Sequence, residues 1–434
     1  MRLSSGLRTT PSLRHAVTLV TASLACVGCG AKTGLYVPDG GDNAPDASFD
    51  AGVDSGMDAG LDADLCIEVP FDGGPVEISL EVEAQVGAAD IAFLIDVTSS
   101  MDQEIDRIRA RLRDSIAPAI REAIPDSRLA VATFADFAVG SYGSSVRGDK
   151  PFELRLPMTD DISAVQAAVN SITMADGRDV EESQVEALYQ LATGEGRGSH
   201  VPPSAGCPSG GRGYACFRSD AMAVVMLFTD AEFHNGPDGA HPYGSDVVPR
   251  PATYPDALAA LRALDMRVIG FDSGRGVPRR HLERVARDTG AVADGDELVY
   301  DIGSTGEGLS AGVVAAIRTF ASTAEQDVDA IYFDGDPTDD VNSADFVEAL
   351  RPLSADPMSG VGSIDFDAGV FRDVTAGTLL TWEVVLRNDA VVPGPRPQRF
   401  RLEVIFRGDM RRRISRAFID IVVPGTDGAG CDGP

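Results

Sequence analysis

The chain has 434 residues, 44% of them hydrophobic, and this length and composition suffice for two or three domains with their own cores. Its formal net charge of −30 excludes the basic surface that nucleic-acid binding requires. An acidic chain is compatible with divalent cations, although acidity alone usually serves solubility.

The N-terminus has the pattern of an export signal. Three arginines precede an uncharged apolar run at residues 16–25, which is too short to span a bilayer but suits a secretory signal. The run ends near Cys26 and Cys29, each preceded by a small residue, and this arrangement resembles a bacterial lipoprotein signal with a lipidated cysteine. We predict a signal peptide over residues 1–29 and lipidation of Cys29. Lipidation of Cys26, or a cleaved signal without lipid, is the alternative.

Cysteine parity favours cleavage before the second of these cysteines. That cleavage removes Cys26 and leaves four cysteines besides the lipidated one, and an even number in an exported chain predicts two disulfides. Of the three possible pairings, we favour Cys207–Cys216, which closes a short Gly-rich loop, and Cys66–Cys431, which ties the ends of the folded body together.

Residues 30–66 have the composition of a linker. Aspartates recur at every fourth position from Asp42 to Asp62 among Gly, Ala and Ser, and on a helix this spacing would stack like charges. We therefore predict a disordered, self-repelling tether. A calcium-binding repeat is the alternative for this segment.

From residue 89 to 325, short apolar runs alternate with segments of helical periodicity. Strands are predicted at 91–95, 129–134, 223–229 and 267–271, and helices at 103–123, 181–192, 257–264, 279–288 and 309–320. This alternation predicts an α/β fold with a doubly wound, mostly parallel sheet.

From residue 326 to 425 the helical periodicity largely stops. Strand-like stretches at 330–333, 364–371, 379–387, 400–406 and 414–423 predict an all-β, sandwich-like module, with residues 426–434 as a tail. The stretch 67–88, with alternation at 76–82, is a candidate to pair with this module. In that case the α/β domain is inserted into the β module.

The strongest signal for function is the sequence Asp96-Val-Thr98-Ser-Ser100-Met101, where a buried strand ends and a helix begins. Ligand sites form at such strand ends in doubly wound sheets. A carboxylate and two hydroxyls spaced two residues apart can converge on one ion. Oxygen donors suit magnesium, manganese or calcium rather than zinc or copper. Helix capping is the alternative for this motif alone.

This motif resembles the metal-ion-dependent adhesion site of von Willebrand factor type A domains. The segment 228–234 (FTDAEFH) resembles the Thr-Asp-Ala-x-x-His stretch of integrin β-subunit domains, and 177–183 resembles their Asp-x-Pro-Glu loop, with Glu181 at the proline position. The resemblance covers residues 89–325 and implies a Rossmann-like fold of this family. It implies a primary metal site formed by Asp96, Thr98, Ser100, Glu182 and Asp230.

The resemblance also implies a second ion, calcium in the family, next to the first. Its ligands would be Asp136, Asp179 and the shared Glu182, while Gly177 stands where the family has an asparagine ligand. The long disulfide-closed loop that sets integrin ligand choice is missing after Asp136, so no integrin ligand is implied.

Two other patterns point to different chemistry. Gly308-Leu-Ser310-Ala-Gly312 matches a nucleophile elbow, but no histidine follows residue 281, so the required Ser…Asp…His order is impossible. The cysteines of the Gly-rich loop could be drawn as zinc ligands with His200 and His234. Their spacing matches no known zinc finger, and we expect the disulfide instead.

These features predict a cell-surface, metal-dependent adhesion or protein-binding lipoprotein that is not an enzyme. We expect Mg²⁺ or Mn²⁺ at the primary site, and a protein partner whose Asp or Glu replaces a metal-bound water. We expect a lipid anchor in the outer membrane or at the cell surface, no nucleic acid and no small-molecule substrate. A structural envelope protein with a stabilising or vestigial metal site is the alternative, and a hydrolase using Asp and Ser is a third hypothesis.

Overall fold

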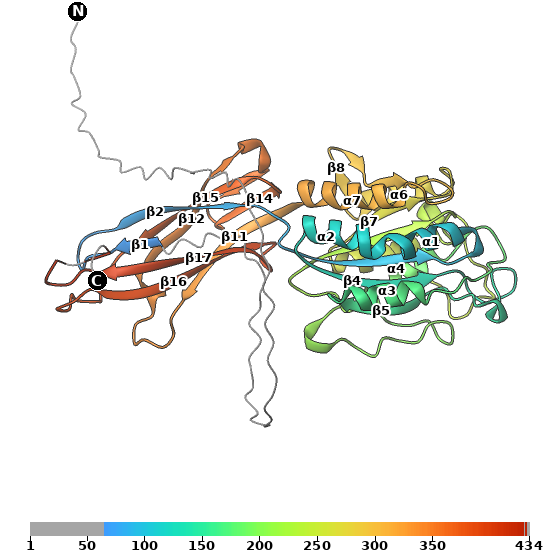
Figure 1. The fold of residues 1–434 in the computed structure, drawn as a ribbon, viewed down its shortest axis with the longest axis horizontal. Helices are drawn as coiled ribbons and strands as arrows, with labels where there is room; N and C mark the ends of the chain where they lie inside the picture. Colours follow the sequence, from blue (N-terminus) through green and yellow to red (C-terminus); the bar gives the residue numbers. More distant parts are fainter. Residues whose placement is uncertain (1–64, 429, 432–434) are drawn as a thin grey trace, which may run out of the picture. The chain divides into compact units, whose positions relative to one another are not determined.

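The computed structural model describes residues 65–428 and 430–431 (Figure 1). The predicted signal peptide, the lipidation site at Cys29 or Cys26 and most of the acidic linker lie outside the described residues. The described chain contains two separate hydrophobic cores, one within residues 86–324 and one formed by residues 69–84 together with residues 328–423.

The first core surrounds a six-stranded sheet in the order β10-β7-β6-β3-β4-β5. The strands are β3 (Ala88–Asp96), β4 (Asp126–Phe134), β5 (Glu153–Thr159), β6 (Met222–Thr229), β7 (Met266–Asp272) and β10 (Val299–Asp301). All neighbouring strands are parallel except β4 and β5. Both β3 and β6 are buried along their whole length, which is why their sequences are mostly apolar.

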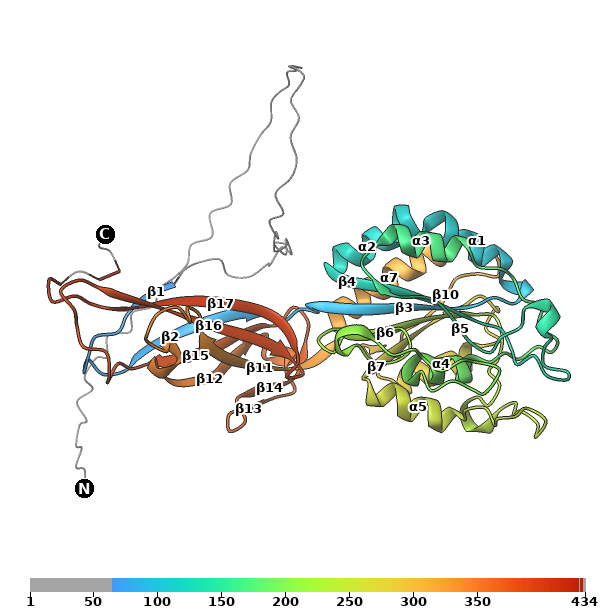
Figure 2. The ribbon, with the colours of Figure 1, turned by 90° about the horizontal axis from the view of Figure 1, so that it is seen from below.

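Helices cover both faces of this sheet, with α1, α2 and α3 on one side and α4 and α5 on the other (Figure 2). The helices are α1 (Asp102–Arg111), α2 (Ala117–Ala123), α3 (Ile162–Asn170), α4 (Gln184–Thr193), α5 (Tyr254–Ala263), α6 (Arg279–Asp288) and α7 (Leu309–Thr323). A short hairpin of β8 (Val292–Ala293) and β9 (Asp296–Glu297) precedes β10. The predicted doubly wound, mostly parallel α/β fold is confirmed.

The helix predicted at 103–123 is interrupted. A π-helical turn, Leu112–Ile116, separates α1 from α2. Pro118 lies in the first turn of α2 and has no N–H to donate to the preceding turn, which accounts for a break at this point. The apolar face continues through the break, because Ile108, Leu112 and Ile116 are all fully buried.

The second core lies between two sheets. One has the order β1-β17-β16-β11-β14-β13, and the other has the order β12-β15-β2. The strands are β1 (Leu65–Glu68), β2 (Val76–Glu83), β11 (Glu325–Asp334), β12 (Val347–Asp356), β13 (Ser363–Asp365), β14 (Val370–Thr375), β15 (Leu379–Leu386), β16 (Gln398–Gly408) and β17 (Arg412–Val423). The ring of Trp382 on β15 packs against Phe371 and Phe406 of the other sheet, at centroid distances of 5.2 and 5.9 Å. This is the predicted sandwich-like module.

One strand predicted in this module is in fact two. The pattern at 364–371 covers β13 and β14, which pair antiparallel with Ile364 opposite Phe371. Gly369 has a φ of +69° in the turn between them, a conformation that glycine adopts without strain. The strand β12 was not predicted, because only Pro352 and Ala355 of its ten residues are buried.

The chain before the α/β domain belongs to the β module. Strand β2 pairs antiparallel with β15 along its whole length, and β1 pairs parallel with β17. In sequence, therefore, the α/β domain is inserted between β2 and β11.

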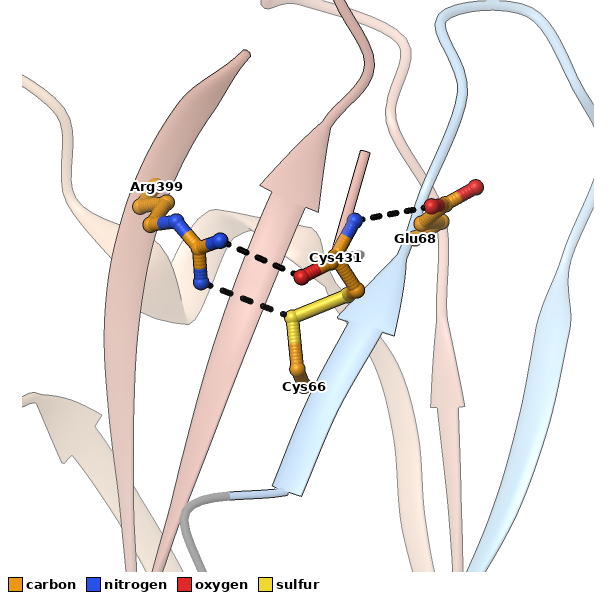
Figure 3. Close-up of a disulfide and its surroundings, with 4 residues drawn as sticks. All are labelled: Cys66, Glu68, Arg399 and Cys431. Carbon is orange, nitrogen blue, oxygen red and sulfur yellow. Dashed lines mark hydrogen bonds between the residues drawn. A yellow bond between two sulfur atoms is a disulfide. The ribbon is translucent and has the colours of Figure 1, made fainter. Parts of the chain in front are cut away.

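Disulfides join the pairs expected from the sequence. Cys66 on β1 is bonded to Cys431 across 365 positions of sequence (Figure 3). Arg399 donates to the carbonyl oxygen of Cys431, and the N–H of Cys431 donates to the carboxylate of Glu68. Cys207–Cys216 closes the Gly-rich loop. Two disulfides indicate a protein of an oxidising compartment. Within the described residues, none of the helices combines the length and the apolar character that crossing a membrane requires.

Candidate metal centre

The predicted primary site lies at the carboxyl ends of the two central strands. Asp96 is the last residue of β3, and Asp230 directly follows β6. The two strands are parallel with Ile95 opposite Phe228, so both aspartates emerge at the same edge of the sheet. A short 3-10 turn after β3, Ser99–Met101, returns the chain toward Asp96 before α1 begins.

Hydrogen bonds connect four of the predicted ligands. Asp96 Oδ1 accepts from the N–H and the hydroxyl of Thr98, at 3.0 and 2.7 Å. The Thr98 and Ser100 hydroxyl oxygens are 3.3 Å apart, and Ser100 Oγ donates to Asp230 Oδ1 at 3.1 Å. On the other side, Asp96 Oδ2 accepts from Thr229 Oγ1 at 2.8 Å. The result is a compact group of oxygen donors drawn from two loops.

The fifth predicted ligand, Glu182, comes from the loop before α4. Its N–H donates to the carbonyl of Glu232 at 3.0 Å, and its carbonyl accepts from the N–H of His234 at 2.8 Å, so this loop is fixed to the loop after β6. A Cβ atom placed on Gly177 would lie 2.9 Å from Glu182 Oε1 and 3.4 Å from Thr98 Cγ2. The glutamate carboxylate therefore lies close to the Thr98 loop, and glycine leaves the room for it.

The electrostatics of this group call for a cation. Burial, and then the charge of Asp230, raise the pKa of Asp96 to about 7, against hydrogen bonds that lower it. Burial, together with the charges of Asp96 and Asp136, raises the pKa of Glu182 to about 11. Burial also raises the pKa of Asp230. A divalent ion would keep these carboxylates ionised, and hard oxygen donors suit Mg²⁺, Mn²⁺ or Ca²⁺.

A second cluster comprises Asp136, Asp179 and His234, with one ligand-type atom of each within 4.8 Å of the others. His234 Nε2 is 3.0 Å from Asp179 Oδ2 and 3.4 Å from Asp136 Oδ2. The Tyr243 hydroxyl and the Phe137 N–H both donate to Asp136 Oδ1. Burial raises the pKa of Asp136 to about 8, although the nearby His234 lowers it.

This second cluster differs from the set predicted by resemblance. Asp136 and Asp179 are brought together, but His234 is the third side chain in contact with them. Glu182 is coupled to this pair through charge, because both aspartates raise its pKa. The histidine could have been found from the segment 228–234 (FTDAEFH), which ends in His234, but only Asp230 of this segment was predicted to be a ligand.

A third group lies nearby. His241 contacts Glu181 Oε1 through Nδ1 and Glu232 Oε2 through Nε2, both at 3.0 Å. One ligand-type atom of each of these three half-buried residues also lies within 4.8 Å of the others.

The competing patterns lead to no site in the described residues. The cysteines drawn as zinc ligands are joined in the Cys207–Cys216 disulfide, and His200 Nε2 lies 3.2 Å from the carbonyl of Val248. Ser310 is the second residue of α7. A cavity of about 900 Å³ borders Tyr243, but Tyr254 and Arg284 in its lining are already paired with Asp288.

The chain matches no protein-family model and no curated protein. Among solved structures, the chain is similar to a von Willebrand factor type A protein from Catenulispora acidiphila, with 10% identity and a TM-score of 0.36 over 83% of this chain and 72% of that one. The pilus adhesin SpaC from Lactobacillus rhamnosus GG, in its open conformation, has 11% identity and a TM-score of 0.32 over 82% of this chain and 46% of that one. Proximal thread matrix protein 1 from the mussel byssus has 16% identity and a TM-score of 0.31 over 55% and 47%.

Proposed function

We propose that this protein is an exported, lipid-anchored surface protein that binds a protein partner through a divalent ion, Mg²⁺ or Mn²⁺. The proposed ligands are Asp96, Thr98, Ser100, Glu182 and Asp230. One observation carries the proposal. Buried carboxylates with raised pKa values converge with two hydroxyls at the carboxyl edge of a parallel sheet, and only oxygen donors are among them.

The exposure of the ligands favours binding from outside. Asp96 and Thr98 are buried, whereas Ser100 is exposed and Asp230 is half-buried. When bound, the ion would supply a positive charge and coordination positions that an Asp or Glu of the partner could complete. Asp96 fixes the Thr98 loop, and Ser100 and Asp230 face the side from which the partner approaches.

We also propose that the site binds and does not catalyse. The Ser100 hydroxyl donates to Asp230, and no imidazole is among its hydrogen-bond partners in the described part of the chain. A serine without a base of suitable pKa is a weak nucleophile.

Attachment to the envelope is a separate part of the proposal. The two disulfides favour export, and the apolar run before Cys29 is typical of a lipoprotein signal. Metabolic labelling with a fatty-acid analogue should label the protein and the Cys26→Ser variant but not the Cys29→Ser variant. An unlabelled parent protein would refute the lipid anchor.

The metal site is tested by titrating the purified, oxidised, chelator-stripped protein with Mg²⁺, Mn²⁺ and Ca²⁺ while following thermal unfolding. An ion present at about 100 times its dissociation constant should add roughly 2.7 kcal/mol to the free energy of unfolding. The variants Asp96→Ala and Asp230→Ala should lose this stabilisation. Asp220→Ala is a matched control, because Asp220 is exposed and precedes the amino end of β6, at the opposite edge of the sheet.

The binding function is tested by recovering a partner from envelope extracts with Mg²⁺ present. The expected partner is released by chelator and is not recovered by Asp96→Ala, while Asp220→Ala recovers it normally. Metal-dependent stabilisation without any chelator-sensitive partner would favour a structural envelope protein. No stabilisation of the parent by any of the three ions would refute the metal site.

A further inference from the structure

A second cluster of ionisable groups lies near the primary site and differs from it in donor chemistry. Asp136 follows β4, Asp179 lies in the loop before α4, and His234 lies in the loop after β6. One ligand-type atom of each lies within 4.8 Å of the other two. The cluster contains an imidazole nitrogen as well as carboxylate oxygens, whereas the primary site contains oxygen donors alone.

The hydrogen bonding of His234 defines which ring nitrogen is available. Nδ1 lies 2.8 Å from the carbonyl oxygen of His241, and a carbonyl can only accept, so Nδ1 carries a hydrogen. Nε2 lies 3.0 Å from Asp179 Oδ2 and 3.4 Å from Asp136 Oδ2. Burial lowers the pKa of His234, but the hydrogen bond to Asp179 and the charge of Asp136 outweigh it and raise this pKa overall. The two carboxylates therefore require a positive charge at Nε2, which either a proton or a bound metal ion can supply.

The carboxylates of the cluster have unused acceptor atoms. Asp136 is completely buried, and its Oδ2 has no hydrogen-bond partner. Asp179 Oδ1 and, close by, Glu182 Oε2 are also buried atoms without a hydrogen-bond partner. Buried acceptors are normally satisfied, and several orphan carboxylate oxygens together indicate a place for a positively charged ligand.

We infer that Asp136, Asp179 and His234 form a binding site for a first-row transition-metal ion such as Zn²⁺, separate from the primary site. Imidazole with carboxylates favours zinc, cobalt or nickel, whereas magnesium and calcium prefer oxygen ligands alone. This donor set differs from the calcium site that the sequence resemblance implies.

The geometry agrees with a small ion. Ligand atoms around a tetrahedral ion with bonds of about 2.0–2.1 Å are about 3.3 Å apart. The distances of 3.0 and 3.4 Å from Nε2 to the two aspartate oxygens are close to that value. A ring N–H that donates to a backbone carbonyl is also the usual outer contact of a metal-binding histidine, because it fixes the tautomer. The side chain of Asp179 is 24% exposed, which leaves a route for the ion.

The inference is tested on the purified, chelator-stripped protein with Zn²⁺ and Co²⁺ as probes. Calorimetric titration should show one tightly bound Zn²⁺ per chain that excess Mg²⁺ or Ca²⁺ does not displace. Co²⁺ should give the visible absorption of a low-coordinate site. His234→Ala should weaken Zn²⁺ binding by more than the roughly 10–100-fold typical of losing an outer-shell contact. His200→Ala is the matched control, since His200 Nε2 contacts a backbone carbonyl and lies outside the cluster.

Two further measurements keep the test decisive. If His234→Ala fails to fold, X-ray absorption of the Zn²⁺-loaded parent protein should still show scattering from an imidazole ligand. Asp96→Asn should lose Mg²⁺-dependent stabilisation and retain Zn²⁺, so failure of the primary site and failure of this site are distinguishable. No Zn²⁺ uptake by the parent, unchanged Zn²⁺ affinity in a folded His234→Ala variant, or absence of imidazole scattering would overturn the inference. The first of these results would mean that a proton on His234 Nε2 is the cation of the cluster.

Discussion

Replacing Asp96 by Asn should stabilise the metal-free protein at pH 8 and abolish its stabilisation by Mg²⁺. Asp96 is fully buried, and burial together with the charge of Asp230 raises its pKa from 3.8 to about 7. A carboxyl group whose pKa is raised on folding destabilises the fold above its unfolded pKa, and the penalty grows until the folded pKa is reached. Asparagine has nearly the same shape and carries no charge, so it removes this penalty.

The size of this stabilisation follows from the pKa shift of Asp96. The change from 3.8 to about 7 corresponds to a penalty on the order of 4 kcal/mol at pH 8, at about 1.4 kcal/mol per pH unit. Asparagine still accepts from Thr98 through its oxygen, but its NH₂ group faces Thr229 Oγ1, which at present donates to Asp96 Oδ2. Losing a hydrogen bond to a charged group costs about 1.5–3 kcal/mol. The net gain expected for Asp96→Asn is therefore about 1–3 kcal/mol.

The assay is urea unfolding of the parent and Asp96→Asn with chelator present, at pH 8 and pH 5. At pH 5 the folded parent is already largely protonated at Asp96. The free-energy penalty of burying Asp96 in the parent should then be only about 2 kcal/mol, and the stability advantage of Asp96→Asn over the parent should shrink or reverse. With saturating Mg²⁺ the order should invert, because only the parent binds the ion. A variant that is less stable than the chelated parent at pH 8, or a difference independent of pH, would refute this account of Asp96.

Three further predictions concern other measurements. Because Asp96 and Glu182, whose pKa values are raised to about 7 and about 11, must lose their protons to bind an ion, the affinity for Mg²⁺ should fall by up to about tenfold per pH unit and per proton as the pH is lowered from 8 to 6; calorimetric affinities that are equal at pH 6 and 8 would contradict this. Trp382→Ala should lower the free energy of unfolding, measured in urea, by roughly 3–5 kcal/mol, because the side chain is fully buried. Trp382→Phe should lower it much less, because phenylalanine keeps a ring in the core and removes a buried N–H that has no hydrogen-bond partner. Phe366→Ala is the control for these variants, because Phe366 is 62% exposed, and a comparable loss in that variant would argue against the sandwich core. Replacing Cys66 and Cys431 by Ser should lower the free energy of unfolding by roughly 2–5 kcal/mol, as measured by the urea midpoint, and an unchanged midpoint would show that this bond does not restrain the unfolded chain.

Local chemistry explains why much of the fold could be predicted from the sequence. The strands β3 and β6 are mostly apolar because both faces of the central sheet are covered. The half-exposed β5 and the mostly exposed β12 have no such apolar run, so neither shows a clear strand pattern in the sequence. The break at Pro118 is local, but the periodicity of the apolar residues hides it.

The sequence by itself determined the groups whose partners are near in the chain. The spacing of Asp96, Thr98 and Ser100 places three oxygens on one short loop, and the Cys207–Cys216 loop is closed by two residues nine positions apart. Only the tertiary structure decided which side chain completes the second cluster. Asp136 and His234 are nearly 100 residues apart, and they meet because parallel strands deliver their loops to the same edge of the sheet. Whether an imidazole or a glutamate faces that aspartate depends on the path of each loop after its strand, and that path is set by contacts such as the His234–His241 hydrogen bond rather than by spacing.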